Sequence, residues 1–217
     1  MTMRKLHWLL GVSFVGLAAL IAAPAAHADH DIDFGVNAPI GGDMGLFFSI
    51  SSRYFDRDPQ VINQWARRYP NPDDLAAFLY ICSQSSERPE GIDYYRRKGL
   101  SWYDVSVRAG VPFDAWYVAV NRNPRGRYAR PYGNLNRYRQ DPRHVARLSD
   151  QEIRDLVALR MAHEYYGVTP EIAMDWRRGG ADVRTIMSRE YRSRHHGDGR
   201  DDDPYDRRRD DDPGGDR

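Results

Sequence analysis

Apolar residues recur along most of the chain at the three- and four-residue spacing of amphipathic helices. Leu75, Phe78, Leu79 and Cys82 show it most clearly, because they occupy the i, i+3, i+4 and i+7 positions of one helix face. Short polar side chains, prolines and glycines divide the remaining apolar positions into further short segments. The pattern therefore predicts a mainly α-helical protein.

Each predicted helix begins with a capping signal, in which a short polar side chain accepts backbone N–H bonds or a proline occupies the first turn. Glycines then end two of the helices. The predicted starts are Asp58, Asn71, Pro89 and Ser101, and the predicted ends are Gly99 and Gly110. Asp104 is placed to complete a capping box with Ser101. The segment 112–120 fits either a short helix or a strand.

A different pattern precedes these helices. Ile32, Phe34 and Val36 alternate with polar or small residues, and 46–50 forms a second apolar run. A proline and two glycines lie between the two runs, so the segment 31–51 is predicted to be a β-hairpin. A single hairpin is not stable alone. It must pack on the helices or pair its edge with another chain.

Two segments of the chain resemble each other at a shift of 81 residues. Residues 74–108 aligned with 155–189 give 9 identities in 35 positions, including Pro-Glu, Arg-Arg and a glycine in the same register. Each segment predicts a helix, a proline-started helix, a glycine stop and a further helix. We interpret the match as an internal duplication, with repeat 1 at about 58–120 and repeat 2 at about 149–191. The alternative is a chance match between the residues that begin and end helices in the two segments.

The segment 101–120 resembles a helix-turn-helix motif, with Gly110 at the turn. A DNA-reading helix needs arginine, lysine, asparagine or glutamine side chains directed at base edges. The second helix of this motif would be 112–120, which holds one acid and none of those residues. We therefore interpret the motif as a feature of how these segments pack in the fold, and we expect no specific DNA binding.

The first 28 residues have the pattern of a secretory signal peptide. Arg4 and Lys5 precede an apolar run of 16 residues, and Ala26 and Ala28 mark a cleavage site. The run is shorter than the roughly 20 residues that a membrane-spanning helix needs, so we expect cleavage after Ala28 and no remaining transmembrane segment. The mature chain would begin at Asp29 and be periplasmic or secreted.

Composition distinguishes the C-terminal tail from the rest of the chain. The 217 residues carry 32 basic and 31 acidic side chains, a formal net charge of +1. Residues 192–217 hold nine aspartates and seven arginines and almost nothing apolar, so this tail is predicted to be a disordered polyampholyte. The remainder, 29–191, is long enough for a single globular domain.

Candidate catalytic and metal-binding residues are few. Cys82 is the only cysteine and lies on an apolar helix stripe, which predicts a buried, inert thiol and no internal disulfide. His163 and Glu164 begin the HExxH pattern of zinc proteases, but Gly167 occupies the place of the second histidine. We expect no catalytic residue, no metal and no cofactor.

An arginine- and tyrosine-rich connector, residues 121–147, lies between the two predicted repeats. It contains eight arginines and one acid. Guanidinium groups suit phosphate and carboxylate oxygens, and aromatic faces suit sugar rings or bases. The connector is therefore either a binding loop for an anionic envelope polymer or a linker laid over acidic helix ends. The candidate binding residues are Arg122, Arg125, Arg127, Tyr128, Arg130, Tyr132, Arg137, Tyr138, Arg139 and Arg143.

Five segments, taken together, resemble a group of exported bacterial proteins of unassigned function. They are DFGVNAPIGGD, SSRYFDRDP, RRYPNPDDLA, GLSWYDVSVRAGVP and HEYYGVTPEIAMDWR, and the resemblance spans 31–195. It implies export and a single folded unit, and it brings no known activity.

These patterns predict a compact helical domain with an internal duplication of a helix-turn-helix-like unit, an N-terminal β-hairpin and a disordered C-terminal tail. The expected function is that of an exported, non-catalytic envelope or interaction protein, with an anionic envelope polymer or an envelope protein as its partner. A cell-wall hydrolase using Glu90 or Glu171 is one alternative, although the helix dipole alone explains an acid in a first turn. An assembly factor that pairs the hairpin edge, from Ile32 to Ile50, with a partner strand is another.

Overall fold

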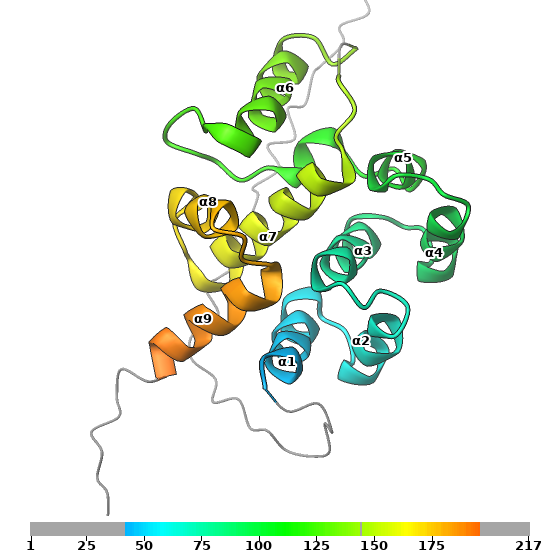
Figure 1. The fold of residues 1–217 in the computed structure, drawn as a ribbon. Helices are drawn as coiled ribbons and strands as arrows, with labels where there is room; N and C mark the ends of the chain where they lie inside the picture. The colour runs from blue at the N-terminus through cyan, green and yellow to red at the C-terminus, as the bar shows by residue number, and fades with distance from the viewer. Residues whose placement is uncertain (1–41, 144, 196–217) are drawn as a thin grey trace, which may run out of the picture.

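The computed structural model describes residues 42–143 and 145–195, and all the regular structure in these ranges is helical (Figure 1). The prediction of a mainly α protein is confirmed. The α-helices are α1 (Asp43–Phe55), α2 (Pro59–Ala66), α3 (Pro72–Gln84), α4 (Pro89–Arg97), α5 (Trp102–Arg108), α6 (Ala129–Gln140), α7 (Asp150–Tyr166), α8 (Pro170–Arg178) and α9 (Val183–His195). Two 3-10 helices, η1 (Phe113–Trp116) and η2 (Gly126–Tyr128), complete the described elements.

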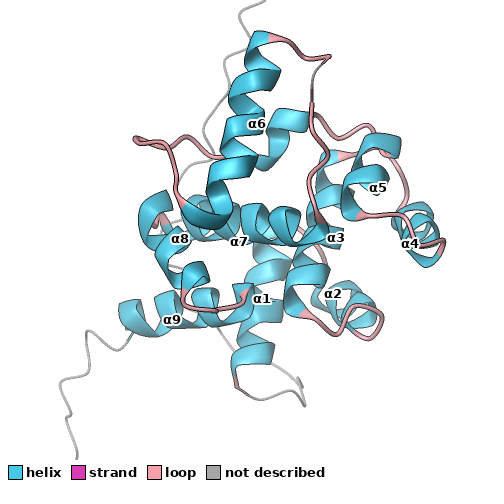
Figure 2. Cartoon of the chain, turned by 45° about the horizontal axis from the view of Figure 1, so that its top comes forward, coloured by secondary structure: helices cyan, strands magenta, loops and turns pink. Residues whose placement is uncertain are grey.

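Helices α3 and α7 pack on each other at the centre of the molecule. Helix α1 packs on α2, α3 and α9, while α4 lies against α3 and α8 lies against α7 (Figures 1 and 2). The core between them contains large aromatic side chains that are almost wholly buried, namely Phe47, Phe78, Tyr80, Trp102 and Trp116. Burial of such rings is the main stabilising contribution available to short helices.

All four predicted helix starts are confirmed, three of them by side-chain caps; α4 begins at Pro89 without a side-chain cap. The Asn71 side chain accepts hydrogen bonds from the backbone N–H of Asp73 (2.9 Å) and of Asp74 (3.3 Å). Asp58 caps α2 and Ser101 caps α5 in the same manner. Each of these bonds satisfies an N–H that the first turn leaves without a helical partner.

At the start of α5 the Ser101 hydroxyl accepts from the Asp104 N–H (3.1 Å) and donates to the Asp104 carboxylate (2.7 Å), so the pair caps the helix without the full geometry of the predicted capping box. The aspartate side chain is one methylene shorter than the glutamate that usually fills this position. A complete capping box is present instead at the start of α7. There the Ser149 backbone N–H donates to Glu152 (2.8 Å) and the Glu152 N–H donates to Ser149 Oγ (3.2 Å).

The predicted N-terminal hairpin is wrong in its second half. The apolar run 46–50 lies inside α1, where Leu46, Phe47, Ile50 and Phe55 face the core. A run of five residues, four of them apolar, cannot distinguish a strand from a buried helix, and here packing on α3 and α9 decides for the helix. The first predicted strand, 32–36, lies outside the described residues, as does the predicted leader.

The helix-turn-helix resemblance does not extend to two helices. After α5 the chain turns at Gly110, which has φ 74°, and then forms only the four residues of η1 before continuing in an extended path. Trp116 is 1% exposed, so η1 anchors a ring in the core. This geometry agrees with the interpretation of the motif as packing.

The two segments that match in sequence also share a backbone pattern. Helix α8 begins and ends 81 residues after α4, and α9 begins 81 residues after α5. The glycines that follow, Gly99 and Gly180, have φ of 82° and 90°. Each donates its N–H to an equivalent carbonyl, that of Arg96 or that of Arg177. We call α3–α5 and α7–α9 the first and second units.

The units contact each other through equivalent side chains. Arg177 of the second unit pairs with Asp73 at the start of α3 (2.9 Å), while Arg96 of the first unit pairs with Asp150 at the start of α7 (3.1 Å). The same two carboxylates also accept backbone N–H bonds, from Val183 and Trp102. Each unit therefore neutralises an acid at the beginning of the other unit's first helix.

The predicted tail begins too early. Residues 192–195 belong to α9, and Arg192 pairs with Asp43 at the start of α1 (2.6 Å). Contact with a neighbouring helix thus orders residues that composition alone assigned to a disordered segment. The remainder of the predicted tail, 196–217, lies outside the described residues. None of the helices in the described ranges has both the length and the apolar character needed to cross a membrane.

Candidate functional site

The connector is largely folded onto the second unit. Residues 126–140 form η2 and α6, and two of the candidate tyrosines lie in the core: Tyr128 is 2% exposed and Tyr132 is 5% exposed. Their hydroxyls donate to the backbone carbonyls of Asp155 (3.3 Å) and Val118 (3.0 Å). Burial raises the pKa of Tyr132 to about 12. The expectation that these two rings face a ligand is corrected, because they anchor the connector.

Tyr138, the third candidate tyrosine, is half-buried. Its ring lies against Phe113 of η1, with 5.0 Å between the ring centroids. It therefore joins α6 to the segment that follows the first unit.

Four connector arginines form ion pairs within the chain. Arg127 lies 3.4 Å from Asp155, and Arg130 pairs with Glu152, both on α7. Arg147 pairs with Asp104 of α5, and Arg143 pairs with Asp141 two residues away (3.3 Å). Three of these contacts reach acids on α5 and α7, two of them in first turns, as the linker interpretation expects.

These pairs stabilise the ionised acids that they contact. Burial acts to raise the pKa of Glu152, but the bonds from Arg130 and from Ser149 outweigh it and hold the pKa below its ordinary value. Bonds from Ser101 and Arg147 likewise lower the pKa of Asp104. The connector arginines thus help to keep the first turns of α5 and α7 negatively charged.

The other four connector arginines have no ion-pair partner within the described ranges. We call them the unpaired arginines, and all four are exposed: Arg122, Arg125, Arg137 and Arg139. Arg122 and Arg125 stand on the loop that precedes η2, and Arg137 and Arg139 lie in the last turn of α6. A guanidinium that is not committed within the protein keeps its donors for an external anion.

Arg122 and Arg125 line a cleft of about 310 Å³ between their loop and α8, which we call the connector cleft. Helix α8 contributes Arg178, which is paired with Asp175 (2.9 Å) and 63% exposed in its side chain. The full lining is Val120, Arg122, Asn123, Pro124, Arg125, Glu171, Met174, Asp175 and Arg178.

The two glutamates of the hydrolase alternative occupy equivalent first-turn positions, Glu90 on α4 and Glu171 on α8. Only Glu171 lines the connector cleft, and Glu90 lies on the other unit. The structure therefore does not bring the two carboxylates into one site.

Cys82 is buried on α3, as predicted, and is 8% exposed. Desolvation raises the pKa of its thiol to about 12. His163 lies with Nδ1 3.0 Å from the Val168 carbonyl oxygen, which fixes the ring in the turn after α7. Within the described part of the chain, no group of three or more histidine, cysteine, aspartate or glutamate side chains is arranged to hold a metal ion.

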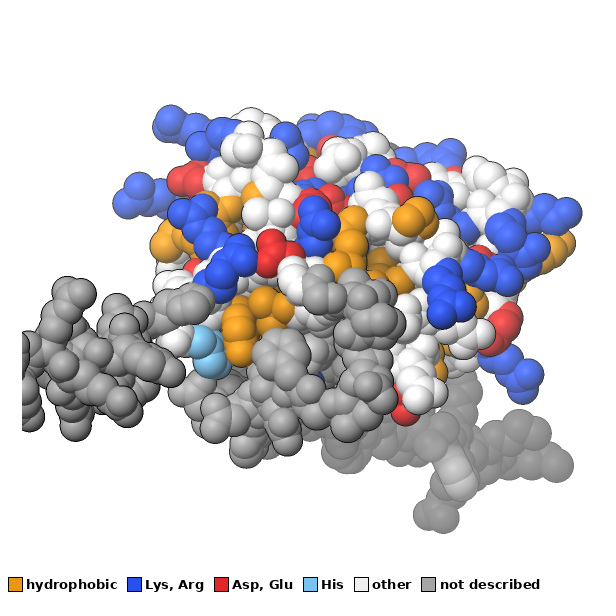
Figure 3. Space-filling model, turned by 60° about the horizontal axis from the view of Figure 1, so that its bottom comes forward, with side chains coloured by type: hydrophobic (Ala, Val, Ile, Leu, Met, Phe, Trp, Pro, Cys, Tyr) orange, Lys and Arg blue, Asp and Glu red, His pale blue; other side chains and the backbone are white. Residues whose placement is uncertain are grey.

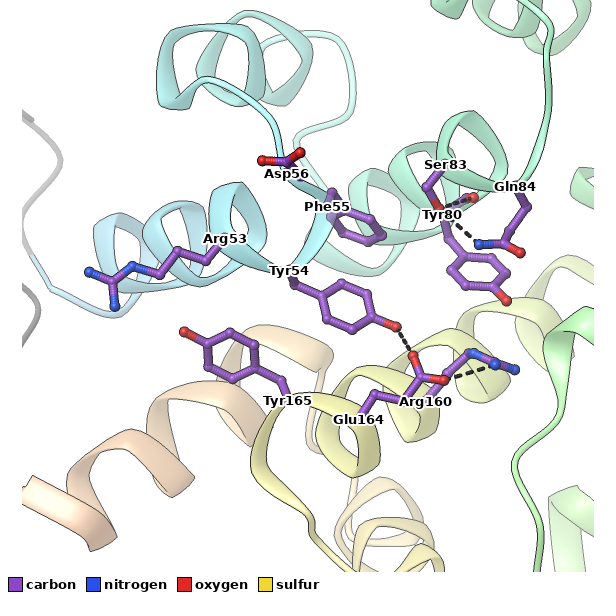
Figure 4. Close-up of a pocket in the computed structure, with 10 residues that line it drawn as sticks. All are labelled: Arg53, Tyr54, Phe55, Asp56, Tyr80, Ser83, Gln84, Arg160, Glu164 and Tyr165. Carbon is purple, nitrogen blue, oxygen red and sulfur yellow. Dashed lines mark hydrogen bonds and ion pairs between the residues drawn. The ribbon is translucent and has the colours of Figure 1, made fainter. Parts of the chain in front are cut away.

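A second cleft, of about 330 Å³, lies where α1, α3 and α7 end, and we call it the tyrosine cleft (Figure 4). Sequence reasoning did not single it out, because its residues come from three distant segments. Its lining combines four aromatic rings with polar and charged groups: Arg53, Tyr54, Phe55, Asp56, Tyr80, Ser83, Gln84, Arg160, Glu164 and Tyr165. The only local sign in the sequence was the run of aromatic and charged residues at 53–58.

Comparisons of the chain with protein-family models, with curated proteins and with solved structures gave no match.

Proposed function

We propose that the protein is an exported, non-catalytic binding protein that holds an anionic polymer of the cell envelope through the unpaired arginines. The single observation that carries this proposal is the division of the connector. All eight of its arginines are exposed, but four of them form ion pairs with acids of the chain and the other four have no ion-pair partner within the described ranges, two of them at a cleft.

The charge of the described surface supports an anionic partner. Residues 42–143 and 145–195 contain 25 arginine and lysine side chains against 19 aspartate and glutamate side chains, although the whole chain is nearly neutral. On the face drawn in Figure 3, basic side chains predominate over acidic ones. Such a surface attracts polyanions at a distance and binds them less tightly as salt increases.

The chemistry of arginine narrows the ligand to phosphate or carboxylate groups. A guanidinium presents several N–H donors in a planar fork that matches two oxygens of either anion. Arg122 and Arg125 lie three residues apart on one loop, so a repeating anionic polymer can meet both. Lipopolysaccharide carries phosphates and wall polymers carry phosphates or carboxylates, and both are expected ligands of an exported chain.

The test is binding of the purified chain to immobilised lipopolysaccharide and to wall fragments at 50 and 300 mM NaCl. The variant Arg122→Gln with Arg125→Gln should weaken binding to one of the polymers at least tenfold at low salt. The matched control is Arg57→Gln with Arg67→Gln, which removes the same charge from exposed positions outside the connector. The control should stay within threefold of the parent.

Two results would overturn this function. Equal losses in both double variants would show a response to net charge alone. Absence of binding to every polymer at 50 mM NaCl would exclude anionic envelope polymers as the ligand.

The repeated backbone pattern also supports our interpretation of an internal duplication. The bounds of α4 and α8 coincide at a shift of 81 residues, and an equivalent glycine turn follows each helix. Two unrelated segments that only share helix start and stop residues would rarely match so closely. On this interpretation the connector is an insertion between two copies of one unit, and only the second copy forms the connector cleft.

A further inference from the structure

The tyrosine cleft lies at the junction of the two units and of α1. Tyr54 comes from the end of α1, Tyr80 from α3, and Tyr165 from the end of α7. Figure 4 shows Tyr54 pointing from α1 toward Glu164 on α7, with Phe55 and Tyr80 on the α3 side of the same space. Phe55 and Tyr80 are buried, at 6% and 2% exposed, so they form the base of the cleft. Tyr54 and Tyr165 are half-buried and are the two rings that an occupant can reach.

The charged groups beneath these rings are held in place. Glu164 accepts a hydrogen bond from the Tyr54 hydroxyl and pairs with Arg160 at 2.8 Å. Arg160 also donates to the carbonyls of Ala115 (2.5 Å) and Tyr117 (2.9 Å). Burial, followed by the negative charge of Glu164, raises the pKa of Tyr54, so its hydroxyl remains a neutral donor. This network gives the cleft a fixed floor.

Polar groups at the rim remain available. Gln84 and Asp56 are exposed, and the side-chain hydrogen bond of Gln84 among the described residues is a long one, 3.4 Å to Ser83 Oγ. The lining contains two arginines and two carboxylates, so its formal charges cancel. A strongly anionic or cationic guest therefore gains little there, whereas a neutral guest with both apolar faces and hydrogen-bonding groups is well matched.

We propose that the tyrosine cleft binds a neutral sugar ring of a glycan. The C–H faces of a sugar pack on aromatic rings, and its hydroxyls exchange hydrogen bonds with amide and carboxylate groups. A volume of about 330 Å³ is near the lower end of the range for small-molecule sites, which suits one or two rings rather than a large ligand. This site is separate from the unpaired arginines, and its existence does not depend on their role.

The test is calorimetric titration of the full chain with chitotriose and with maltotriose, two neutral oligosaccharides. The parent should bind at least one of them. Gln84→Ala and Tyr165→Ala should each weaken that binding at least fivefold, since each removes one contact at the edge of the cleft. Neither side chain is fully buried, and circular dichroism checks that the variants fold.

The matched control is Tyr94→Ala, which removes a tyrosine that is 48% exposed on α4, away from the cleft. It should change the affinity less than twofold. The proposal is overturned if neither oligosaccharide binds, if the control loses as much as the cleft variants, or if tetramethylammonium binds in the cleft in their place. The last result would identify a cation site built from the same rings.

Discussion

Arg177, at the end of α8, donates to both carboxylate oxygens of Asp73, at the start of α3, across 104 residues of sequence (3.1 and 2.9 Å). Its other nitrogens donate to Asp155 of α7 at 3.0 and 2.6 Å. The Arg177 side chain is only 3% exposed. The two carboxylates outweigh the effect of burial and raise the pKa of Arg177 above its ordinary value. One guanidinium therefore joins the two units in a place that water does not reach.

We expect Arg177→Met to reduce the free energy of unfolding by about 3–5 kcal/mol, because it leaves Asp73 buried without its cation and leaves the buried Asp155 with the longer contact to Arg127, at 3.4 Å. The control is Arg178→Met on the same helix, whose pair with Asp175 is exposed on both sides. Exposed pairs of this kind contribute about 0–1 kcal/mol. Urea denaturation measures both variants. Equal, small losses would show that the buried pair does not hold the units together.

The helix starts were predictable because their causes are local. An asparagine at 71 followed by Pro72 specifies a cap and a first turn whatever the rest of the chain does. The same holds for Ser101, and for the glycine turns whose φ angles exclude most other residues. Capping therefore identified most of the first unit from sequence alone.

The second predicted strand failed because the signal at 46–50 was too short to define a period. Leu46 and Ile50 lie on one helix face, but the same run also reads as a buried strand. Only the partners of α1 in the fold distinguish the two, and these include α9, almost 150 residues away. The N-terminal element thus depended on tertiary contacts that no local pattern contains.

Composition left two interpretations of the connector, a binding loop or a linker laid over acidic helix ends, and the structure divides its arginines into a paired and an unpaired set. Sequence could not separate Arg122, which is uncommitted within the described ranges, from Arg130, which pairs with Glu152. The difference arises from the position of α7 under the connector. The tyrosine cleft was missed for a similar reason, because Tyr54 and Glu164 are 110 residues apart.

Low pH should reduce the free energy of unfolding partly through protonation of Glu152. Its pKa in the folded state lies below the ordinary value of 4.5, since the bonds from Arg130 and Ser149 outweigh burial. Between the two values the unfolded state binds more protons, so the contribution is complete above about pH 4.5 and is lost as pH falls through the folded pKa. We expect Glu152→Gln to lose on the order of 1 kcal/mol at pH 7.

Urea denaturation at a series of pH values checks this expectation. Glutamine preserves the geometry of the capping box but removes the charge, so the gap between parent and variant should close as the pH falls below about 4.5. The variant Arg130→Met removes the other partner of the pair, so its free energy of unfolding should depend less on pH below about 4.5 than that of the parent. A gap that stays constant down to pH 3 would show that the ionisation of Glu152 does not contribute.

The glycine turns of the two units should respond alike to substitution. Gly99 and Gly180 have φ of 82° and 90°, and a Cβ built at either would meet no atom within 4 Å. The cost of Gly99→Ala or Gly180→Ala is therefore that of the left-handed backbone alone, about 1–2 kcal/mol in each case. Gly133 provides the opposite case, because it lies inside α6 with open space at its Cβ and no positive φ.

We expect Gly133→Ala to stabilise the protein by about 0.5–1 kcal/mol, since alanine loses less conformational entropy than glycine on entering a helix. Thermal unfolding of the three variants measures the two effects with one method. Similar destabilisation at Gly99 and Gly180, together with stabilisation at Gly133, would show that both units need a glycine at the turn because its φ is positive. A large difference between Gly99→Ala and Gly180→Ala would contradict the equivalence of the two turns.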